Sequence, residues 1–447
     1  MGIFEIVKMM AVIGGFIIFF LFLNWLEKSQ RFNSELNRKI LHIGSGIGGI
    51  LLPFIFKEKM PVVILGIFFL ALLTGIRVIR HKAAGLKKVV EMKSRKTLGD
   101  IYFVISILGL WCVSGEDRIL YILPLIVLML SDAFAALIGE FYSKFKFDTG
   151  FGTKSIEGSV IFLLTTYSVC SNFFLLFSNI RNVNIVLLSL LLSILTMILE
   201  VISWNGLDNL FIPFFVYLFL KLNLYASTEE LRYKFLVITG LFIIIILNRK
   251  KTTLTRTAQT ASLFFMYLVT AIGGIMWLIP PLVMYLGYYH FTPKVEGQAR
   301  DSLKGLLTIA LSTFIWLGGS IIFDREILAV VYIFSFSLHF ALINLIRYNA
   351  AYSDGKTFKM KFLYISMGKG AVFFFFNYFL FSRLLNIPMV VGSVILLVTG
   401  VLLYELIITL LYNMGYRERI LGEKKVFISS GVVFLLSSYL CMTLLVF

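Results

Sequence analysis

The chain has few charged residues and very little cysteine or histidine, and each shortage excludes a class of protein. Only 15% of its 447 residues are charged and 59% are hydrophobic, whereas about a quarter of an average soluble domain is charged. A soluble globular fold is therefore not expected. The three cysteines, Cys112, Cys170 and Cys441, lie far apart, and the four histidines are scattered along the chain. Neither redox chemistry nor a zinc site is predicted.

The apolar residues are concentrated in runs of roughly 18–22 residues, the length at which an α-helix crosses the core of a bilayer. Such runs must be helical in lipid, because the bilayer core offers no hydrogen-bond partner to an unpaired backbone group. We therefore predict an all-α fold, a polytopic transmembrane helical bundle of about fourteen spans. The first run, residues 4–26, has a long apolar core and no small-residue cleavage site after it, so a retained helix is expected rather than a signal peptide.

The positive charge of the chain is expected to orient it in the membrane. Lys and Arg number 41 against 24 Asp and Glu, a net charge of +17, and the basic residues lie in short connections between apolar runs. Under the positive-inside rule these connections face the cytoplasm. No nucleic-acid partner is predicted, although some basic residues could also hold anionic lipid head groups or nucleotide phosphates. The basic connections are residues 77–96, 144–154, 249–256, 347–361 and 417–425.

Polar residues beside apolar runs divide the chain into two halves. Most of them lie in residues 1–225, which we predict to form one membrane domain. In residues 226–447, the predicted second membrane domain, acidic residues are rare and Glu405 alone lies deep inside an apolar run. Polar residues within membrane segments are costly and tend to be functional, so the first half is where a site is expected.

The first two polar groups of this half are rich in cations. Arg38, Lys39 and His42 begin an apolar run, and residues three or four apart share a face of a helix. They could bind phosphate or anchor the helix at the membrane interface. A second group around Arg95 ends a basic connection just before Asp100. It is either the flank of a membrane helix or a contact for a triphosphate.

The third polar group places Asp132 between an apolar run and a series of small residues that ends at Gly139. A carboxylate at such a depth needs a partner. Mg²⁺ is one candidate, because it prefers one or two carboxylates together with substrate phosphates. Small neighbours would also allow another helix or a ligand to approach closely.

The fourth polar group contains Gly152, Lys154, Ser155 and Glu157. Glycine lets the backbone approach a phosphate closely, and lysine supplies a point charge. The spacing is not that of a P-loop, and no strand is expected before it. Lys154 and Glu157 are instead expected to share the face of a helix that begins here.

The fifth polar group contains Glu200, Gly206, Asp208 and Asn209. Gly206 and the polar residues after it predict a break in the helix, and broken helices at membrane depth line a cavity or a site. Glu200 ends one apolar run and Asp208 begins the next, so both carboxylates would be costly without a metal or ligand.

Taken in order, these groups resemble the motifs of the CTP-dependent polyprenol kinase family, which includes dolichol kinase, phytol and farnesol kinases and the CTP-dependent diacylglycerol kinase of yeast. The resemblance covers roughly residues 35–220. Two positions depart from the family pattern, because Ser131 stands where glycine is usual and Glu140 where a basic residue is common. The matching residues are Arg38, Lys39 and His42; Asp132, Ala135 or Ala136, and Gly139; Gly152, Lys154, Ser155, Glu157 and Gly158; and Glu200, Gly206, Asp208, Asn209, Ile212 and Pro213.

The resemblance implies transfer of the γ-phosphoryl group of CTP, or of ATP, to a membrane lipid alcohol: a polyprenol, dolichol, phytol or diacylglycerol. Such transfer depends on positioning and on charge neutralisation. Asp132 and Asp208 would hold Mg²⁺, and Lys154 would neutralise the transferring phosphate. Glu157 or Glu200 would orient or deprotonate the alcohol. The residues expected to bind the nucleotide are Arg38, Lys39, His42, Arg95, Gly152, Ser155 and Asn209.

The sequence of the second half, residues 226–447, indicates its function less clearly. Residues 254–262 and 297–301 faintly resemble the opening of the phytyl-phosphate kinase family, but that family's central acidic motif has no counterpart near residues 344–356. We therefore expect a degenerate or non-catalytic domain for lipid binding or assembly, or an unrelated membrane domain.

Two other functions fit part of the sequence. A transporter would also have many spans and a broken helix near Gly206, although the second half shows no matching break. A phosphatidate cytidylyltransferase-like enzyme would also use CTP and Mg²⁺, but the group around Lys154 favours the kinases. The lipid alcohol, the nucleotide and the oligomeric state stay open.

Overall fold

The structure divides into two compact units. Unit 1 is Met1–Leu236 and unit 2 is Val237–Phe447. The boundary expected near residue 226 precedes α9 (Thr228–Asn248), whereas this division falls inside the helix. The computed structural model describes residues 2–28, 34–82, 97–115, 117–250, 252, 254–293, 303–323, 327–352, 360–381, 387–414 and 418–446.

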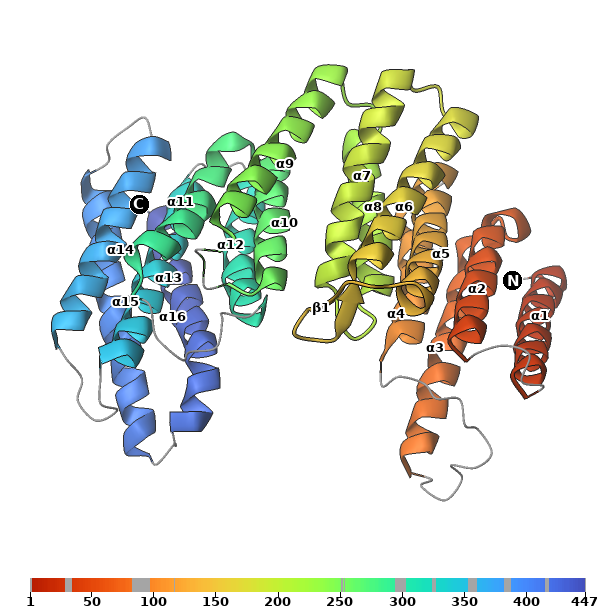
Figure 1. Ribbon diagram of the computed structural model, residues 1–447, viewed down its shortest axis with the longest axis horizontal. Coiled ribbons are helices and arrows are strands. Elements are labelled where there is room, and N and C mark those ends of the chain that lie inside the picture. Colours follow the sequence, from red (N-terminus) through yellow and green to blue (C-terminus); the bar gives the residue numbers. More distant parts are fainter. Residues whose placement is uncertain are drawn as a thin grey trace. The chain divides into compact units, whose positions relative to one another are not determined.

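Nearly all the regular structure of the described residues is α-helical (Figure 1). Ten of the described helices are long and apolar enough to cross a membrane, and two shorter apolar helices, Gly99–Val113 and Ile275–Tyr288, accompany them. The chain is thus an all-α protein with the helices that a multi-pass membrane protein requires. The expected total of about fourteen spans stays a prediction.

Unit 1 is built around a close pair of helices, α5 (Arg118–Phe141) and α6 (Ile156–Phe177). The small residues between them allow this approach, because a β-carbon on Gly158 would lie 3.0 Å from the carbonyl oxygen of Ala135. Ser131 and Thr166 also form a hydrogen bond of 2.8 Å between the two helices. Before α9, unit 1 contains α1 (Ile3–Lys28), α2 (Ser34–Ile55), α3 (Lys59–Lys82), α4 (Gly99–Val113), α5 (Arg118–Phe141), β1 (Lys146–Asp148), β2 (Thr153–Ser155), α6 (Ile156–Phe177), α7 (Asn182–Ile202) and α8 (Asp208–Asn223).

A short β-hairpin, absent from our expectation, connects α5 to α6. Strand β1 pairs antiparallel with β2, and Phe147 lies opposite Lys154. Gly150 turns the chain between the strands with a φ of 81°, a value that glycine adopts readily. Helix α6 begins only after Ser155, whose hydroxyl accepts a hydrogen bond of 3.1 Å from the Gly158 amide and caps the helix. The expectation that Lys154 and Glu157 share a helical face is therefore wrong, because Lys154 lies on a strand.

The predicted break near Gly206 is confirmed. Helix α7 ends at Ile202 and α8 begins at Asp208, and between them Asn205 and Gly206 have positive φ values of 52° and 85°. A β-carbon at Gly206 would lie only 2.6 Å from the backbone nitrogen of Gly99. Glycine is thus needed here both for the backbone conformation and for the close approach of α4.

Unit 2 is a helical bundle with α13 (Ile327–Tyr352) at its centre. In the most apolar stretch of this helix, 89% of the residues are buried. Its core includes the fully buried rings of Tyr332, Phe334, Phe336 and Phe374. Of the two segments that resemble the phytyl-phosphate kinase family, residues 254–262 include the first turns of α10 (Arg256–Gly273). Residues 297–301 lie outside the described residues. After α9, unit 2 contains α10 (Arg256–Gly273), α11 (Ile275–Phe291), α12 (Leu303–Phe323), α13 (Ile327–Tyr352), α14 (Met360–Phe381), α15 (Ile387–Asn413) and α16 (Glu418–Val446).

Candidate functional site

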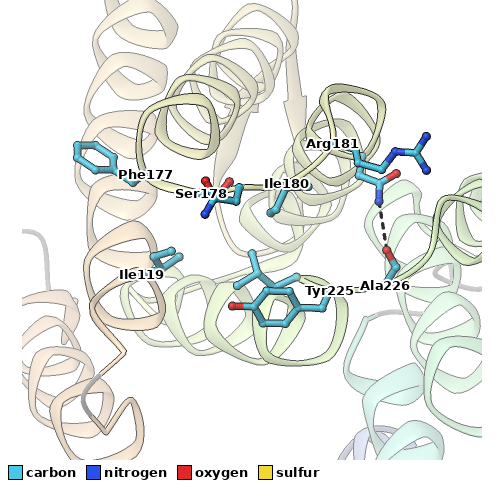
Figure 2. A pocket seen from close by; sticks show the side chains of 10 residues that line it. Ile119, Phe177, Ser178, Ile180, Arg181, Tyr225 and Ala226 are labelled. Atoms are coloured by element: carbon cyan, nitrogen blue, oxygen red, sulfur yellow. Dashed lines mark hydrogen bonds between the residues drawn. The ribbon is translucent and has the colours of Figure 1, made fainter.

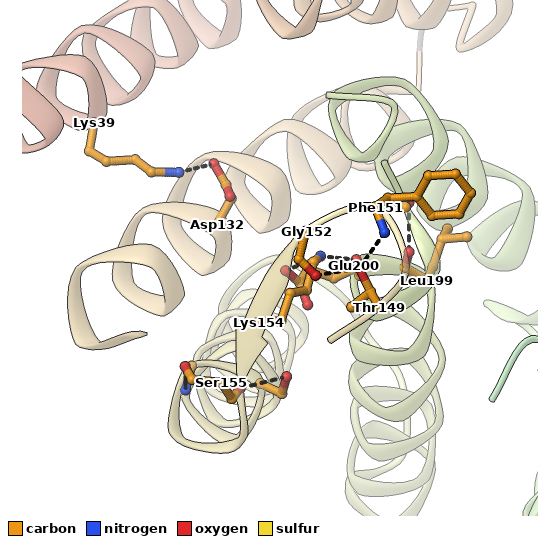
Figure 3. A network of polar contacts seen from close by, with 12 residues as sticks. Lys39, Asp132, Thr149, Phe151, Gly152, Lys154, Ser155, Leu199 and Glu200 are labelled. Atoms are coloured by element: carbon orange, nitrogen blue, oxygen red, sulfur yellow. Dashed lines mark hydrogen bonds and ion pairs between the residues drawn. The ribbon is translucent and has the colours of Figure 1, made fainter. Parts of the chain in front are cut away.

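Four of the five polar groups singled out in the sequence meet at one end of unit 1. At this end α5 and α7 finish, α6 and α8 begin, and the hairpin connects α5 to α6 (Figure 1). Figure 3 shows the resulting network, to which α2, α5, β2 and α7 each contribute a charged side chain. Residues that are far apart in the sequence are therefore brought together by the fold.

The first ion pair of this network joins α2 to α5. Lys39 Nζ lies 2.6 Å from Asp132 Oδ2, and the Lys39 side chain is only 3% exposed. His42, one helical turn further along α2, places Nε2 at 3.7 Å from the same carboxylate oxygen and packs its ring against Phe103. The partner that a buried Asp132 requires is therefore a lysine 93 residues earlier in the chain.

The second ion pair joins the hairpin to α7. Lys154 Nζ lies 2.5 Å from Glu200 Oε1 and also donates a hydrogen bond to the Glu200 backbone carbonyl. The hairpin positions this lysine by holding it in a short paired strand. Phe151, at the hairpin turn, stacks on Trp204 with ring centroids 5.0 Å apart, which fastens the hairpin to the connection between α7 and α8.

Asp208 connects the two ion pairs electrostatically. It lies within electrostatic range of Asp132, Lys154 and Lys39, and Glu200 in turn interacts with Asp208 and Asp132. Three carboxylates thus share the region with two lysines. Among the described residues Asp208 has no cation within ion-pair distance, in contrast to the other two carboxylates.

Asn209 adds an oxygen without a hydrogen-bond partner. Its side-chain nitrogen donates to the Gly99 carbonyl at 3.0 Å, and its backbone carbonyl accepts from Ser106 Oγ at 2.6 Å. Its side-chain Oδ1 is buried and accepts no hydrogen bond. A buried polar atom of this kind is costly unless a ligand, ion or water satisfies it.

The donors at this site fit Mg²⁺. The carboxylates of Asp132 and Asp208 and the free Oδ1 of Asn209 are oxygen ligands, which Mg²⁺ prefers. In the part of the chain that the structure describes, no three His, Cys, Asp or Glu side chains are grouped closely enough to hold a metal by themselves. Phosphate oxygens of a nucleotide would therefore have to complete the coordination.

Several residues expected at the site have other contacts. Glu157 accepts hydrogen bonds of 2.8 Å and 3.1 Å from the backbone amides of Lys144 and Phe145, and so holds the start of the hairpin. Gly152 is exposed at the hairpin turn, and its carbonyl accepts from the hydroxyl of Thr149. Neither Glu157 nor Gly152 forms an ion pair or hydrogen bond with the charged network.

The remaining expected residues differ in how far the structure describes them. Ser155 is buried and caps α6. Arg38 is exposed but lies within electrostatic range of Asp132. Arg95 lies outside the described residues. Arg77, at the start of the basic connection 77–96, forms an ion pair with Asp100 and a 2.7 Å hydrogen bond to the Thr97 carbonyl.

A cavity of about 390 Å³ lies at the opposite end of unit 1. Figure 2 shows the side chains that line it. Phe177, at the end of α6, Arg181, just before α7, and Tyr225, just after α8, contribute to its lining. The charged network lies where these helices have their other ends. The cavity is therefore separate from the candidate site.

Comparison of the chain with protein-family models, curated proteins and solved structures found no match.

Proposed function

We propose that unit 1 transfers the γ-phosphoryl group of CTP to the hydroxyl group of a membrane lipid alcohol in a Mg²⁺-dependent reaction. The observation that carries the proposal is the joining of four distant polar groups into one network, in which Lys39 pairs with Asp132 and Lys154 pairs with Glu200. These groups are the ones that resemble the polyprenol kinases. Charged side chains at the ends of apolar helices are costly, and a phosphoryl-transfer site uses charges of both signs.

The chemistry needs little more than positioning and neutralisation of charge. The lipid oxygen forms a bond to the γ-phosphorus, the bond from that phosphorus to the β–γ bridging oxygen breaks, and CDP leaves. The hydroxyl proton passes to a carboxylate, for which Glu200 is favoured over Glu157 because Glu157 is held by the hairpin backbone. Lys154 is hydrogen-bonded to Glu200. Its ammonium group would turn to the transferring phosphoryl group and neutralise the negative charge there.

Asp132, Asp208 and Asn209 Oδ1 would hold Mg²⁺, which would supply positive charge to neutralise the phosphates. Lys39 keeps Asp132 ionised and in place until Mg²⁺ binds, because a buried carboxylate without a cation is unfavourable. Arg38 lies on the same helix and adds positive charge that attracts a nucleotide.

The location of the network at the helix ends suits a lipid substrate. A hydroxyl head group at the membrane surface would reach Lys154 and Glu200 while its hydrocarbon tail stays beside the apolar helices. The basic residues 144–154 adjoin the network, and the positive-inside rule then favours a cytoplasmic site.

The test is a transfer assay with purified full-length protein, Mg²⁺, and polyprenol, dolichol, phytol or diacylglycerol in mixed micelles. CTP radiolabelled at the γ-phosphorus should transfer its label to the lipid, and CTP labelled at the α-phosphorus should not. Label arriving only from the α position would indicate a cytidylyltransferase instead. ATP labelled at the γ-phosphorus tests the nucleotide preference. No transfer from either nucleotide to any of these lipids, by protein that is monodisperse and binds CTP, would overturn the proposal.

A further inference from the structure

Lys369 of unit 2 is a cation in the middle of an apolar helix. Helix α14 is long and apolar enough to cross a membrane. Lys369 lies in its middle third, about 14 Å along the axis from Met360 at a rise of 1.5 Å per residue. A lysine within an apolar helix is costly and usually marks a site. The side chain of Lys369 reaches the end of α11, where Phe291 is the last residue.

The ammonium group of Lys369 is surrounded by neutral oxygens. Its Nζ donates to Tyr348 Oη at 2.8 Å, to Asn344 Oδ1 at 3.1 Å and to the backbone carbonyl of Phe291. It also lies 4.8 Å from the centroid of the Tyr348 ring. Among the described residues no carboxylate is within 4.0 Å of it. Its hydrogen bonds are thus satisfied, whereas its charge is not neutralised by any described side chain.

A second, independent feature lies one turn away on the same helix. Ser366 is fully buried, and its hydroxyl oxygen has no hydrogen-bond partner. Residues three apart share a helical face, so Ser366 and Lys369 lie on the same side of α14. A buried hydroxyl without a partner is unfavourable unless a ligand or water satisfies it.

Arg347 places further positive charge at this end of α13. Its side chain is buried, its guanidinium lies 4.8 Å from the centroid of the Tyr288 ring, and it donates to the carbonyl of Pro293 at 3.4 Å. Arg347 and Tyr348 are adjacent on α13. The charge of Lys369 and the hydroxyl groups of Ser366 and Tyr348 are suited to an anion with several oxygens.

A purely structural role for Lys369 explains fewer of the contacts around Lys369 and Ser366 than an anion-binding role does. Lysine near the last turn of a helix can bind free carbonyls, and Phe291 is the last residue of α11. That role would use one of the three hydrogen bonds of Lys369. It accounts for neither the uncompensated charge nor the free hydroxyl of Ser366.

We infer that Lys369, Ser366, Asn344 and Tyr348 form a binding site for the phosphate group of an anionic membrane lipid. Lys369 would neutralise the phosphate, and the hydroxyl groups of Ser366 and Tyr348 would hydrogen-bond to its oxygens. Asn344, whose side-chain nitrogen donates to the Phe340 carbonyl, would hold Lys369 in place through its Oδ1. Free inorganic phosphate shares this chemistry and is the alternative source of the ligand. The site stands on unit 2 alone and does not depend on the function proposed for unit 1.

The experiment compares full-length wild-type protein with two single variants in nanodiscs. Affinity for a photoactivatable phosphatidic acid is measured in a phosphatidylcholine background, and the crosslinks are mapped by mass spectrometry. Crosslinks should fall on α13 and α14. Lys369→Met should weaken binding about tenfold or more, since a hydrogen bond to a charged group is lost. Ser366→Ala should weaken it about two- to tenfold.

Lys361→Met provides a matched control, because Lys361 is an exposed lysine in the first turn of the same helix. It should retain wild-type affinity. Competition by millimolar inorganic phosphate at α13 and α14, with no effect of the lipid, would identify free phosphate as the ligand. Wild-type affinity for both phosphatidic acid and phosphate in Lys369→Met would overturn the proposal. If Lys369→Met does not insert, unchanged affinity in Ser366→Ala overturns it equally.

Discussion

The two units compensate the charge of their buried and half-buried lysines in different ways. In unit 1, Lys39 and Lys154 each form an ion pair with a carboxylate from a distant part of the chain. In unit 2, Lys369 contacts only neutral oxygens among the described residues. A lysine that is paired with a carboxylate of the protein is stable without a ligand. When an anionic ligand binds, the lysine can leave the carboxylate and pair with the ligand. A lysine without such a carboxylate favours an anion from outside the protein.

The largest effect is expected from Asp132→Asn, which should abolish lipid phosphorylation. The substitution removes a proposed Mg²⁺ ligand and also leaves Lys39 buried without a counterion, which costs about 3–5 kcal/mol in comparable buried pairs. Activity is measured by label transfer from CTP, and stability by thermal unfolding in detergent.

A double variant separates the loss of the proposed Mg²⁺ ligand from the loss of the counterion of Lys39. Asp132→Asn combined with Lys39→Met removes both charges of the pair and should regain most of the stability, but none of the activity. If the double variant or Asp132→Asn itself turns over at a near-normal rate, Asp132 does not belong to a catalytic site.

Lys154→Ala should lower turnover by about 10²-fold or more, because the charge beside the transferring phosphoryl group is lost. Lys154→Arg should not restore the full rate, since a planar guanidinium replaces a compact ammonium group. Lys146→Ala is the control, as Lys146 is an exposed lysine on the partner strand of the same hairpin. Equal rates for Lys154→Ala and Lys146→Ala would contradict a phosphate role for Lys154.

Gly206→Ala should reduce turnover about tenfold through misplacement of Asp208. It should also destabilise unit 1 by roughly 2–5 kcal/mol, because the positive φ and the contact with Gly99 both oppose a β-carbon. Gly115→Ala is a useful comparison, since Gly115 has a φ of 65° but open space around it. It should lose only about 1–2 kcal/mol and keep full activity. A Gly206→Ala protein with unchanged turnover and stability would show that the break does not position the site.

The smallest effect is expected from removal of most of unit 2. A chain of residues 1–250 keeps α9 and every residue of the charged network, so its turnover should stay within about threefold of the full-length value. The measurement is label transfer by the truncated protein after purification as a single species. A truncated protein that binds CTP but transfers no phosphate would show that unit 2 completes the site.

Features that depend on local sequence could be predicted. Apolar runs of membrane length dictate helices, and Gly206 followed by polar residues indicates the break between α7 and α8. The grouping of Lys39, Asp132, Lys154 and Glu200 was also expected, although through a family resemblance rather than from spacing. The helices and the break each have a signal within a few neighbouring residues.

Features that depend on distant pairing could not be predicted. The hairpin strands are only three residues long, too short for a recognisable alternation of polar and apolar residues. The pairing of Asp132 with Lys39 spans 93 residues, and no periodicity connects them. Glu157 could not be separated from Glu200 as a site residue, because its position is decided by the backbone amides of Lys144 and Phe145.

The contact between α5 and α6 limits how far these helices can slide. A β-carbon on Gly139 or Gly158 would lie less than 3 Å from the Ser155 hydroxyl, so the interface leaves no room for even a methyl group. Asp132 belongs to one helix, and Lys154 lies two residues before the start of the other. A slip of a single residue would carry one charge about 1.5 Å past its proper position, half the length of a hydrogen bond. The close helix contact at Gly139 and Gly158 thus fixes the distance between the charges of Asp132 and Lys154.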